Sequence, residues 1–161
     1  MSTIYVGVGE YAVSNKPGDV IKTLALGSCV GVMTMIPDLK VAGLLHVALP
    51  DSSISPKRVK ERPGMFADTG IPLLINEMKR FGYTGNGKMI VKLAGGAAIM
   101  DPNNTFNIGK RNILAVKKIL WQYKLGPRAE HVGDKISRTV SVEVESGRIL
   151  LSSPGRGEWE L

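Results

Sequence analysis

Residues 23–50 read TLALGSCVGVMTMIPDLKVAGLLHVALP and contain the chain's only cysteine, Cys29, and one of its two histidines, His46. Two apolar runs, over residues 30–36 and 41–49, follow the cysteine and are separated by only a few residues. Two such runs with a short connection predict a β-hairpin. The hairpin would place the thiol close to the imidazole, and we expect the rest of the chain to be organised around it.

A thiol beside an imidazole is the minimum equipment of a cysteine nucleophile, because the base generates the thiolate that attacks. A lone cysteine is more often a small buried hydrophobic residue, and a histidine in an apolar run is more often part of the core. Gly27 and Ser28 favour catalysis, because they predict a turn whose backbone N–H groups can point at a substrate oxygen. These two turn residues are therefore the candidate oxyanion and substrate-binding residues.

The chain carries a formal charge of +7, which suggests an acidic partner or simply a basic surface. The acidic partner could be a nucleic acid, a membrane surface or an acidic protein. Aromatic residues make up only 6% of the chain and are not interleaved with basic ones, so we expect no nucleic-acid-binding platform. No apolar run approaches the ~20 residues that cross a bilayer, so we expect no membrane insertion.

The single cysteine excludes an intrachain disulfide and a cysteine-rich zinc site. With so few soft ligands in the chain, we expect neither a bound metal nor another cofactor. A free thiol fits a reducing compartment, and the first residues lack the pattern of a secretory signal. Both observations predict a cytoplasmic protein.

Short apolar or alternating runs predict strands near residues 4–8, 11–14, 20–26, 30–36, 41–49, 89–94, 140–145 and 148–151. Helical spacing predicts helices within residues 65–81, with Pro72 in the first turn, and over residues 108–125. Gly95 and Gly96 predict a close approach of the backbone to another element. We therefore expect an α+β fold, a layered α/β sandwich in which helices pack on a largely antiparallel or mixed sheet.

We expect a single domain over residues 1–151. Residues 51–64 are polar and basic and predict a mobile loop near the histidine end of the site. Residues 101–104 predict a turn, and residues 152–161 lack periodicity and predict a loose C-terminal tail. His131 is far from the cysteine in sequence, and we expect it to be a surface or structural residue.

An ordered set of short motifs resembles the CheD family of bacterial chemoreceptor glutamine deamidases. Thr23, Cys29 and His46 stand at the spacing of that family, the cysteine within LGSCV and the histidine four residues before a proline. The likeness covers most of the chain, and its other motifs are GVGEY at 7–11, AD at 67–68, GGA at 95–97, IGKRN at 108–112 and SRT at 137–139. The family more often has glycines just before the arginine of the last motif, where this chain has DKIS.

The resemblance implies a three-layer α/β domain, distantly like the cysteine hydrolase toxins that deamidate host proteins. It implies deamidation of glutamine side chains on chemoreceptor cytoplasmic helices to glutamate through a thioester, the activity of a protein-glutamine glutaminase. Cys29 would be the nucleophile, His46 the general base and then acid, and Thr23 the residue that orients His46. The implied partners are the receptor helices and a CheC-type phosphatase, and the positive charge suits an acidic receptor segment.

Three other functions remain open from the residues alone. A papain-like cysteine protease or an acyltransferase would use the same cysteine and histidine on another substrate. A non-catalytic adaptor that binds a chemotaxis phosphatase would use Cys29 only for packing. Nucleic-acid binding rests on charge alone, because the chain contains no nucleic-acid reader motif.

Overall fold

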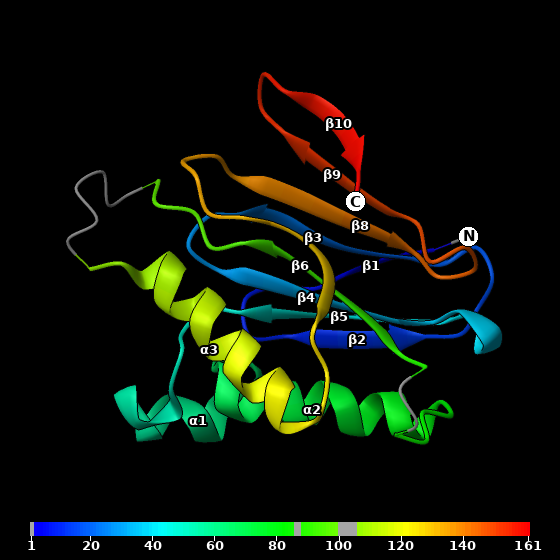
Figure 1. Ribbon diagram of the computed structural model, residues 1–161, viewed down its shortest axis with the longest axis horizontal. Coiled ribbons are helices and arrows are strands. Elements are labelled where there is room, and N and C mark those ends of the chain that lie inside the picture. Colours follow the sequence, from blue (N-terminus) through cyan, green and yellow to red (C-terminus); the bar gives the residue numbers. More distant parts are fainter. Residues whose placement is uncertain (1, 86–87, 100–105) are drawn as a thin grey trace.

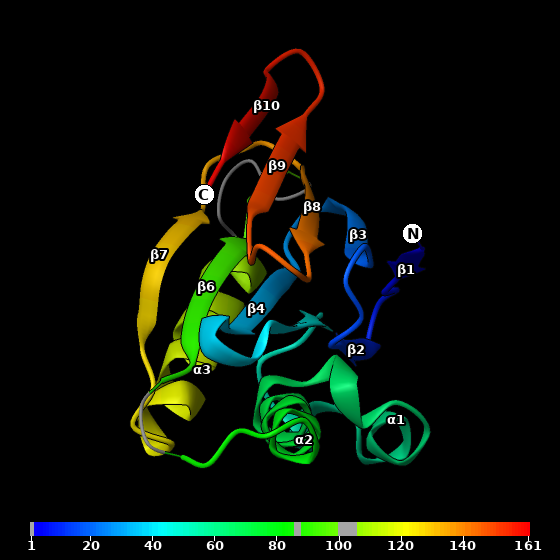
Figure 2. The same ribbon diagram turned by 90° about the vertical axis from the view of Figure 1, so that its right-hand side faces the viewer.

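The computed structural model of the chain has three layers, which are two stacked β-sheets and a layer of helices on the outer face of one of them (Figure 1). It describes residues 2–85, 88–99 and 106–161, so the turn expected at residues 101–104 lies outside the described residues. Figure 2 shows the same three layers from the side. This architecture confirms the expected α+β sandwich of mixed sheets.

The first sheet has the strand order β1 (Thr3–Tyr5), β3 (Val20–Leu26), β8 (Arg138–Glu143), β9 (Ile149–Ser153) and β10 (Gly157–Glu160). Only the pairing of β1 with β3 is parallel among these described strands. Along β8, buried and half-buried residues alternate. This alternation arises because one face of the strand packs on the second sheet.

The second sheet has the strand order β2 (Tyr11–Ser14), β5 (Val41–Val47), β4 (Val30–Ile36), β6 (Ile90–Gly95) and β7 (Pro127–Val132). Strands β4 and β5 form the antiparallel hairpin that the sequence predicts. Every residue of both strands is buried, because the sheet lies between the first sheet and the helices. Burial on both faces explains their nearly continuous apolar sequence.

The helical layer consists mainly of α2 (Ala67–Arg80) and α3 (Ile108–Gln122), which cover the outer face of the second sheet (Figures 1 and 2). Helix α2 directs a stripe of apolar residues at helical spacing into the core: Ile71, Leu74, Ile75 and Met78. A shorter helix, α1 (Pro56–Glu61), and the 3₁₀ turns η1 (Pro37–Leu39), η2 (Ser52–Ile54) and η3 (Pro63–Met65) complete the layer and its connections.

The core has one apolar cluster between the two sheets and another between the second sheet and the helices. Alternate residues of the hairpin belong to different clusters: Met33 and Leu44 face the other sheet, whereas Val32 and Leu45 face the helices. Side chains two residues apart in a strand point to the same face. The imidazole of His46 therefore faces the space between the sheets.

The last ten residues are not the loose tail that we expected. They complete β9 and form β10, which pairs antiparallel with β9. Trp159 of β10 packs against the inter-sheet cluster, and its ring centroid lies 5.0 Å from that of His131. A four-residue strand with one apolar residue has no period that sequence reasoning can detect.

Two further expectations need correction in the helical layer. Residues 51–64 form η2, α1 and η3 rather than a mobile loop. Ser55 accepts a hydrogen bond from the Arg58 N–H and Pro56 is the first residue of α1, so the segment carries its own helix-start signal. Pro72 lies inside α2 and not in its first turn.

Strand β7 was not predicted at all. It lies at the edge of the second sheet and pairs parallel with β6. It begins with Pro127, which is acceptable at the first residue of an edge strand because the missing N–H has no ladder partner to lose.

Candidate active site

Three elements supply the expected catalytic residues. Thr23 belongs to β3 of the first sheet, Cys29 follows the turn between β3 and β4, and His46 is near the end of β5. In Figure 1 the turn between β3 and β4 and the end of β5 lie at the same (left) end of the molecule as α1 and the start of α3. The fold therefore brings residues from both sheets together at one end.

A hydrogen bond joins Thr23 to His46 across the two sheets. The Oγ1 atom of Thr23 lies 2.8 Å from Nδ1 of His46 and donates to the carbonyl of Val6 at 2.7 Å. A hydroxyl has one proton to donate, so Oγ1 must accept the second bond from Nδ1–H. The structure therefore assigns the imidazole tautomer in which Nε2 carries the lone pair.

The other ring nitrogen of His46 has no hydrogen-bond partner among the described residues. Nε2 is buried, the whole residue is only 4% exposed, and no described residue hydrogen-bonds to this atom. Buried polar atoms nearly always have a partner, and an exception calls for an explanation. A nitrogen with a lone pair in this position can accept a proton from a thiol or from a bound molecule.

Cys29 lies on the same side of the hairpin as His46. It is half-buried and packs against the inter-sheet cluster, one residue before β4 begins. Gly31, two residues further along the chain, is the register partner of His46. Diagonal neighbours in such a pair have Cα atoms about 7–8 Å apart and Cβ atoms somewhat closer. The thiol and the imidazole thus face each other diagonally.

Burial sets the charge state of both groups. It raises the pKa of the Cys29 thiol. It also lowers the pKa of His46 to about 4, although the charge of Glu10 works in the opposite direction. At neutral pH the site therefore contains a neutral thiol and a neutral imidazole and not a thiolate–imidazolium pair.

The carbonyls of Gly27 and Ser28 are both held by other elements. The Gly27 carbonyl accepts from the N–H of Ala97, and the Ser28 carbonyl accepts from the side chain of Asn112. The described residues contain no cis peptide bond, so each following N–H points away from the carbonyl. The N–H groups of Ser28 and Cys29 are therefore turned away from Ala97 and Asn112.

Asn112 is a site residue whose role sequence reasoning missed. It belongs to α3, is 0% exposed, and its Nδ2 donates to the carbonyls of Ser28 and Ala48, each at 2.9 Å. It thereby joins the cysteine turn to the chain just after His46. The available signal was a polar residue on the buried stripe of α3, whose other members are Gly109, Val116 and Leu120.

Gly95 and Gly96 confirm the predicted close approach of the backbone. A Cβ atom at Gly95 would lie 2.2 Å from the carbonyl oxygen of Cys29, and one at Gly96 would lie 2.4 Å from Cδ1 of Ile113. Both residues also have positive φ angles, of 108° and 65°. The N–H of Gly96 donates to the Cys29 carbonyl at 2.8 Å. Glycine is thus required on both steric and conformational grounds.

A cavity of about 1110 Å³ begins beside the cysteine turn. Its lining includes Gly27 and Ser28 but not Cys29 or His46, so it adjoins the reacting groups and does not enclose them. The rest of its wall comes from residues 96–99, residues 106–110, Ile113, residues 133–136 and Arg156. The charged residues of this lining are three basic ones and one acidic one: Lys110, Lys135, Arg156 and Asp134.

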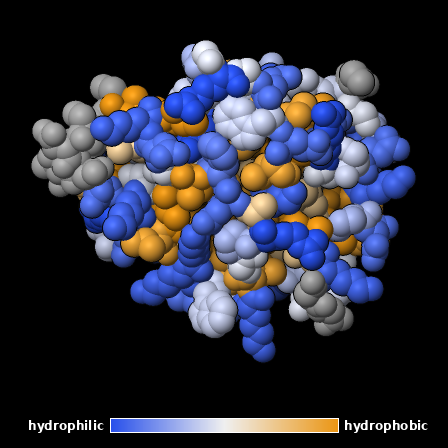
Figure 3. Space-filling model, turned by 45° about the horizontal axis from the view of Figure 1, so that its top comes forward, coloured by the Kyte–Doolittle hydropathy of each residue, from blue (hydrophilic) through white to orange (hydrophobic). Residues whose placement is uncertain are grey.

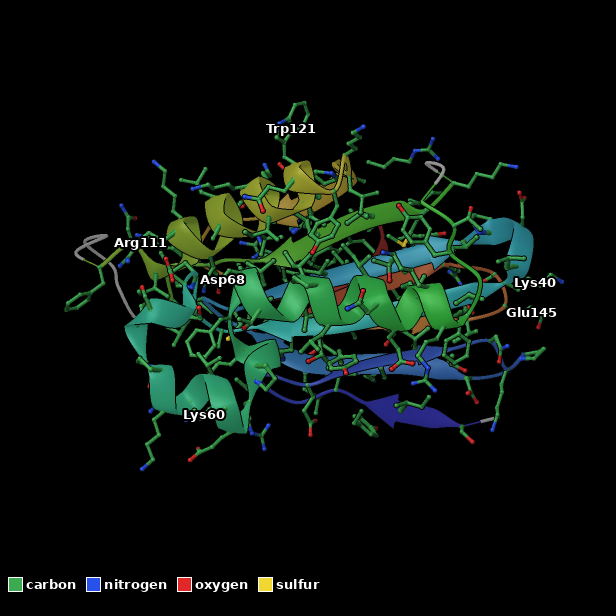
Figure 4. All side chains as sticks on the ribbon, turned by 90° about the horizontal axis from the view of Figure 1, so that it is seen from below. Lys40, Lys60, Asp68, Arg111, Trp121 and Glu145 are labelled. Carbon is green, nitrogen blue, oxygen red and sulfur yellow. The ribbon has the colours of Figure 1, made fainter. Side chains whose placement is uncertain are left out.

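Helix α1 adds further positive charge at the same end of the molecule as the end of β5 (Figure 1). Lys57, Arg58 and Lys60 are exposed on it, and Figure 4 shows Lys60 pointing away from the body of the molecule. Nη1 of Arg62, which ends the helix, donates to the carbonyl of Val8 at 2.7 Å.

Figure 3 shows the molecule with the top of Figure 1 turned forward. Many hydrophilic side chains lie on this face, with apolar surface between them.

The described part of the chain offers neither a metal-binding cluster nor a membrane-spanning helix. Across residues 2–85, 88–99 and 106–161, no group of three or more His, Cys, Asp or Glu side chains is arranged to hold a metal ion. In the same described ranges, no helix is both long enough and apolar enough to span a bilayer.

The chain is similar to proteins with a named activity. The family model "CheD chemotactic sensory transduction" matches residues 48–153. The chain is 54% identical to the probable chemoreceptor glutamine deamidase CheD of Syntrophotalea carbinolica, with all of both chains covered. It is 40% identical to the chemoreceptor glutamine deamidase CheD of Thermotoga maritima, over 95% of this chain and 93% of that protein. Probable chemoreceptor glutamine deamidase CheD 1 of Syntrophus aciditrophicus is 43% identical, with 96% of each chain covered.

Proposed function

This chain belongs to the CheD family, and we propose that it deamidates glutamine side chains on the cytoplasmic helices of chemoreceptors. The observation that carries the proposal is the His46 ring, in which Thr23 fixes the proton on Nδ1 and leaves Nε2 unpartnered beside the only cysteine. The names of the relatives indicate the substrate. The activity is that of a protein-glutamine glutaminase working in the cytoplasm.

The first half of the reaction forms a thioester. Nε2 of His46 takes the proton of the Cys29 thiol, and the thiolate attacks the carbon of the glutamine side-chain amide. The N–H groups of Ser28 and Cys29 stabilise the oxyanion of the tetrahedral intermediate. The His46 imidazolium then gives its proton to the departing nitrogen, so that ammonia leaves rather than an amide anion.

The second half of the reaction hydrolyses the thioester and leaves a glutamate side chain on the receptor. Nε2 of His46 accepts a proton from water as the water oxygen attacks the thioester carbon. The Cys29 thiolate leaves and regains its proton from the imidazolium, which restores the neutral pair. Thr23 accepts Nδ1–H throughout and keeps the ring oriented, although a hydroxyl stabilises imidazolium less than a carboxylate would.

The neutral resting state has a consequence for the order of events. Because burial disfavours both the thiolate and the imidazolium, the proton transfer occurs as the substrate binds and not beforehand. The described residues contain no hydrogen bond to Nε2, so the thiol and the ring come within hydrogen-bond distance only when substrate arrives. A resting thiol is also a weaker nucleophile toward adventitious electrophiles than a thiolate.

The receptor helix docks between α1 and the cavity beside the cysteine turn. Exposed Lys57, Arg58 and Lys60 on one side and the basic cavity residues on the other suit a glutamine among acidic residues. Charge reversal of these three α1 residues to Glu lowers kcat/KM on receptor chiefly at low salt, because ions screen such fields over ~10 Å at 0.1 M. An unchanged kcat/KM at low salt would remove α1 from the docking surface.

A CheC-type phosphatase is the second partner that we propose for this basic face. The support is the net charge of +7 together with the family membership, and no nucleic acid is involved. Co-elution of this chain with such a phosphatase, lost in the α1 charge-reversal variant, is the test of the contact. Independent elution of the two proteins would argue against it.

The deciding experiment mixes the purified chain with a receptor cytoplasmic fragment and analyses the fragment by mass spectrometry. Deamidation adds about one dalton for each converted glutamine and leaves the chain intact, because only the side-chain amide is hydrolysed. Backbone cleavage would indicate the protease instead, and a transferred group would indicate the acyltransferase. An unmodified fragment, together with binding of a chemotaxis phosphatase by the chain, would indicate the adaptor. The Cys29→Ala variant is the control for contaminating activity.

A further inference from the structure

Arg138, the first residue of β8, is a fully buried cation. Its side chain is 0% exposed and is the largest fully buried one in the described part of the chain. In those described ranges its hydrogen-bond partners are one imidazole and three backbone carbonyls, and none is a carboxylate. Burial lowers the pKa of Arg138, although the charge of Asp134 works in the opposite direction without a hydrogen bond to the guanidinium among the described residues. The cation therefore depends on its hydrogen bonds to neutral acceptors.

The guanidinium connects two loops beside the cavity. Its Nε donates to Nδ1 of His131 at 2.8 Å, and its Nη2 donates to the carbonyl of Gly133 at 2.9 Å. Its Nη1 lies 3.3 Å from the carbonyls of Gly95 and Ile136. One planar group thus holds the end of β6 against the loop between β7 and β8.

The segment that follows Gly95 supports the cysteine turn directly. The N–H of Gly96 donates to the carbonyl of Cys29, and the N–H of Ala97 donates to the carbonyl of Gly27, both at 2.8 Å. The absence of a side chain at Gly95 allows this close contact. The position of the turn therefore depends on where residues 95–97 are held.

The start of β8 also holds the strand that leads to the cysteine. Arg138 is the register partner of Leu26, and Oγ1 of Thr139 accepts from the N–H of Ala25 at 3.0 Å. This contact lies at the irregularity between Thr23 and Leu26, where Ala25 has a φ of 48°. The strained backbone between two proposed catalytic residues is thus stabilised by β8.

We propose that Arg138, oriented by His131, is a positioning residue that holds residues 95–97 and the end of β3 so that Cys29 and the oxyanion N–H groups stay aligned with His46. The role rests on the proposed deamidation and acts through the backbone. Burial raises the pKa of the Cys29 thiol, which is the opposite of what a nearby cation would do, so the charge of Arg138 is not what activates the thiol.

The chemistry of both side chains suits this role. A guanidinium directs several N–H donors in one rigid plane, whereas a lysine presents a single flexible ammonium that cannot reach the same carbonyls together. His131 can accept from Arg138 only while Nδ1 is unprotonated. Burial and the charge of Arg138 lower the pKa of His131, which keeps this acceptor available at neutral pH.

The test measures kcat, KM and amide hydrogen exchange in Arg138→Met and Arg138→Lys. Both variants should lower kcat about tenfold with KM changed less than about twofold, because a small misplacement of the reacting groups costs rate rather than binding. The amides of Gly96 and Ala97 should exchange faster in both variants. Met78→Ala, which opens the core on the helical side of the second sheet, should leave kcat and these two amides as in wild type.

His131 provides a second pair of variants in case the arginine variants do not fold. His131 is half-buried, so its replacement is tolerated more readily. His131→Leu removes the acceptor and should lower kcat about threefold, and His131→Gln should recover the rate because its amide oxygen accepts from Nε.

Three results would overturn the proposal: protected Gly96 and Ala97 amides in folded Arg138 variants, an unchanged kcat in His131→Leu, or an equal loss in Met78→Ala. Failure of the proposed function is distinguishable, since it appears as no glutamine conversion by the wild type. Amide exchange at Gly96 and Ala97 tests whether Arg138 holds residues 95–97 even if the wild type converts no glutamine.

Discussion

The two histidines of this chain show how the partner on Nδ1 decides what the other nitrogen can do. His46 donates from Nδ1 to a threonine hydroxyl that has already used its own proton, so Nε2 is left as a base. His131 accepts at Nδ1 from a guanidinium that can only donate, so its proton is on Nε2. Identical side chains thus differ in tautomer, and only the first is suited to take a proton from a thiol.

The largest effect should come from replacing the two histidines in the same way. His46→Gln removes the base and should lower kcat for deamidation by about 10³-fold or more, because general base and nucleophile act as a unit. His131→Gln retains an acceptor for Arg138 and should keep most of the rate. Mass spectrometry of glutamate formation measures kcat in both variants. Similar losses of kcat in the two variants would mean that the two histidines do not differ in their roles.

The pH dependence of stability should also single out His46. Its pKa is lowered to about 4 in the folded chain from the ordinary 6.5, so the unfolded chain binds a proton first as pH falls. The free energy of unfolding should therefore decrease as pH drops from 6.5 to about 4, by up to about 3 kcal/mol from this one group.

Urea unfolding of wild type and His46→Leu at neutral pH and near pH 4 isolates this contribution, because the two proteins share every other titratable group. The variant should lose correspondingly less stability on acidification. Equal losses in the two proteins would mean that His46 titrates normally in the fold.

The threonine that fixes the His46 tautomer gives a smaller effect. Thr23→Val keeps the shape but removes the hydroxyl, so the ring can turn or change tautomer, and kcat should fall about 30-fold. Thr23→Ser restores the hydroxyl and should recover much of the rate. Steady-state kinetics of both variants decide the matter, and equally impaired variants would point to packing rather than hydrogen bonding.

Asn112 should have the smallest effect of this series. Asn112→Leu leaves the carbonyls of Ser28 and Ala48 without their side-chain donor, which should lower kcat about tenfold and cost about 1–3 kcal/mol of stability. Val116→Ala, on the same buried stripe of α3, is the matched control that should affect stability alone. Equal kcat values in these two variants would leave Asn112 with a packing role only.

The parts of the fold that followed from sequence are those whose burial is complete or regular. Strands β4 and β5 are buried at every residue, and the alternation in β8 reflects its one covered face, so both had a readable pattern. Strands β7 and β10 had none, since each lies at a sheet edge, has no fully buried residue and contains charged residues. Sequence patterns therefore predicted the centre of the second sheet and its β2 edge, and missed the β7 edge of that sheet and the β10 edge of the first.

The candidate site divides in the same way. Two apolar runs and a short connection predict the hairpin that brings Cys29 and His46 together, and the register seen in the structure places both on the same side. The contacts of Asn112 and Arg138 with the cysteine turn and its neighbours join residues more than 40 positions apart, and no local pattern specifies such contacts. Sequence reasoning can thus propose the reacting groups, while the residues that hold them require the three-dimensional structure.

The most direct test of the account is to trap the Cys29 thioester with hydroxylamine during turnover of a receptor fragment. Hydroxylamine should compete with water for the thioester and yield a glutamyl hydroxamate, about 16 daltons heavier than glutamine, because a thioester is open to such nucleophiles. Wild type should form this product at the same residues that it deamidates, and Cys29→Ala should form none. Deamidation by the wild type without any hydroxamate, or hydroxamate formation by Cys29→Ala, would contradict a cysteine-linked intermediate.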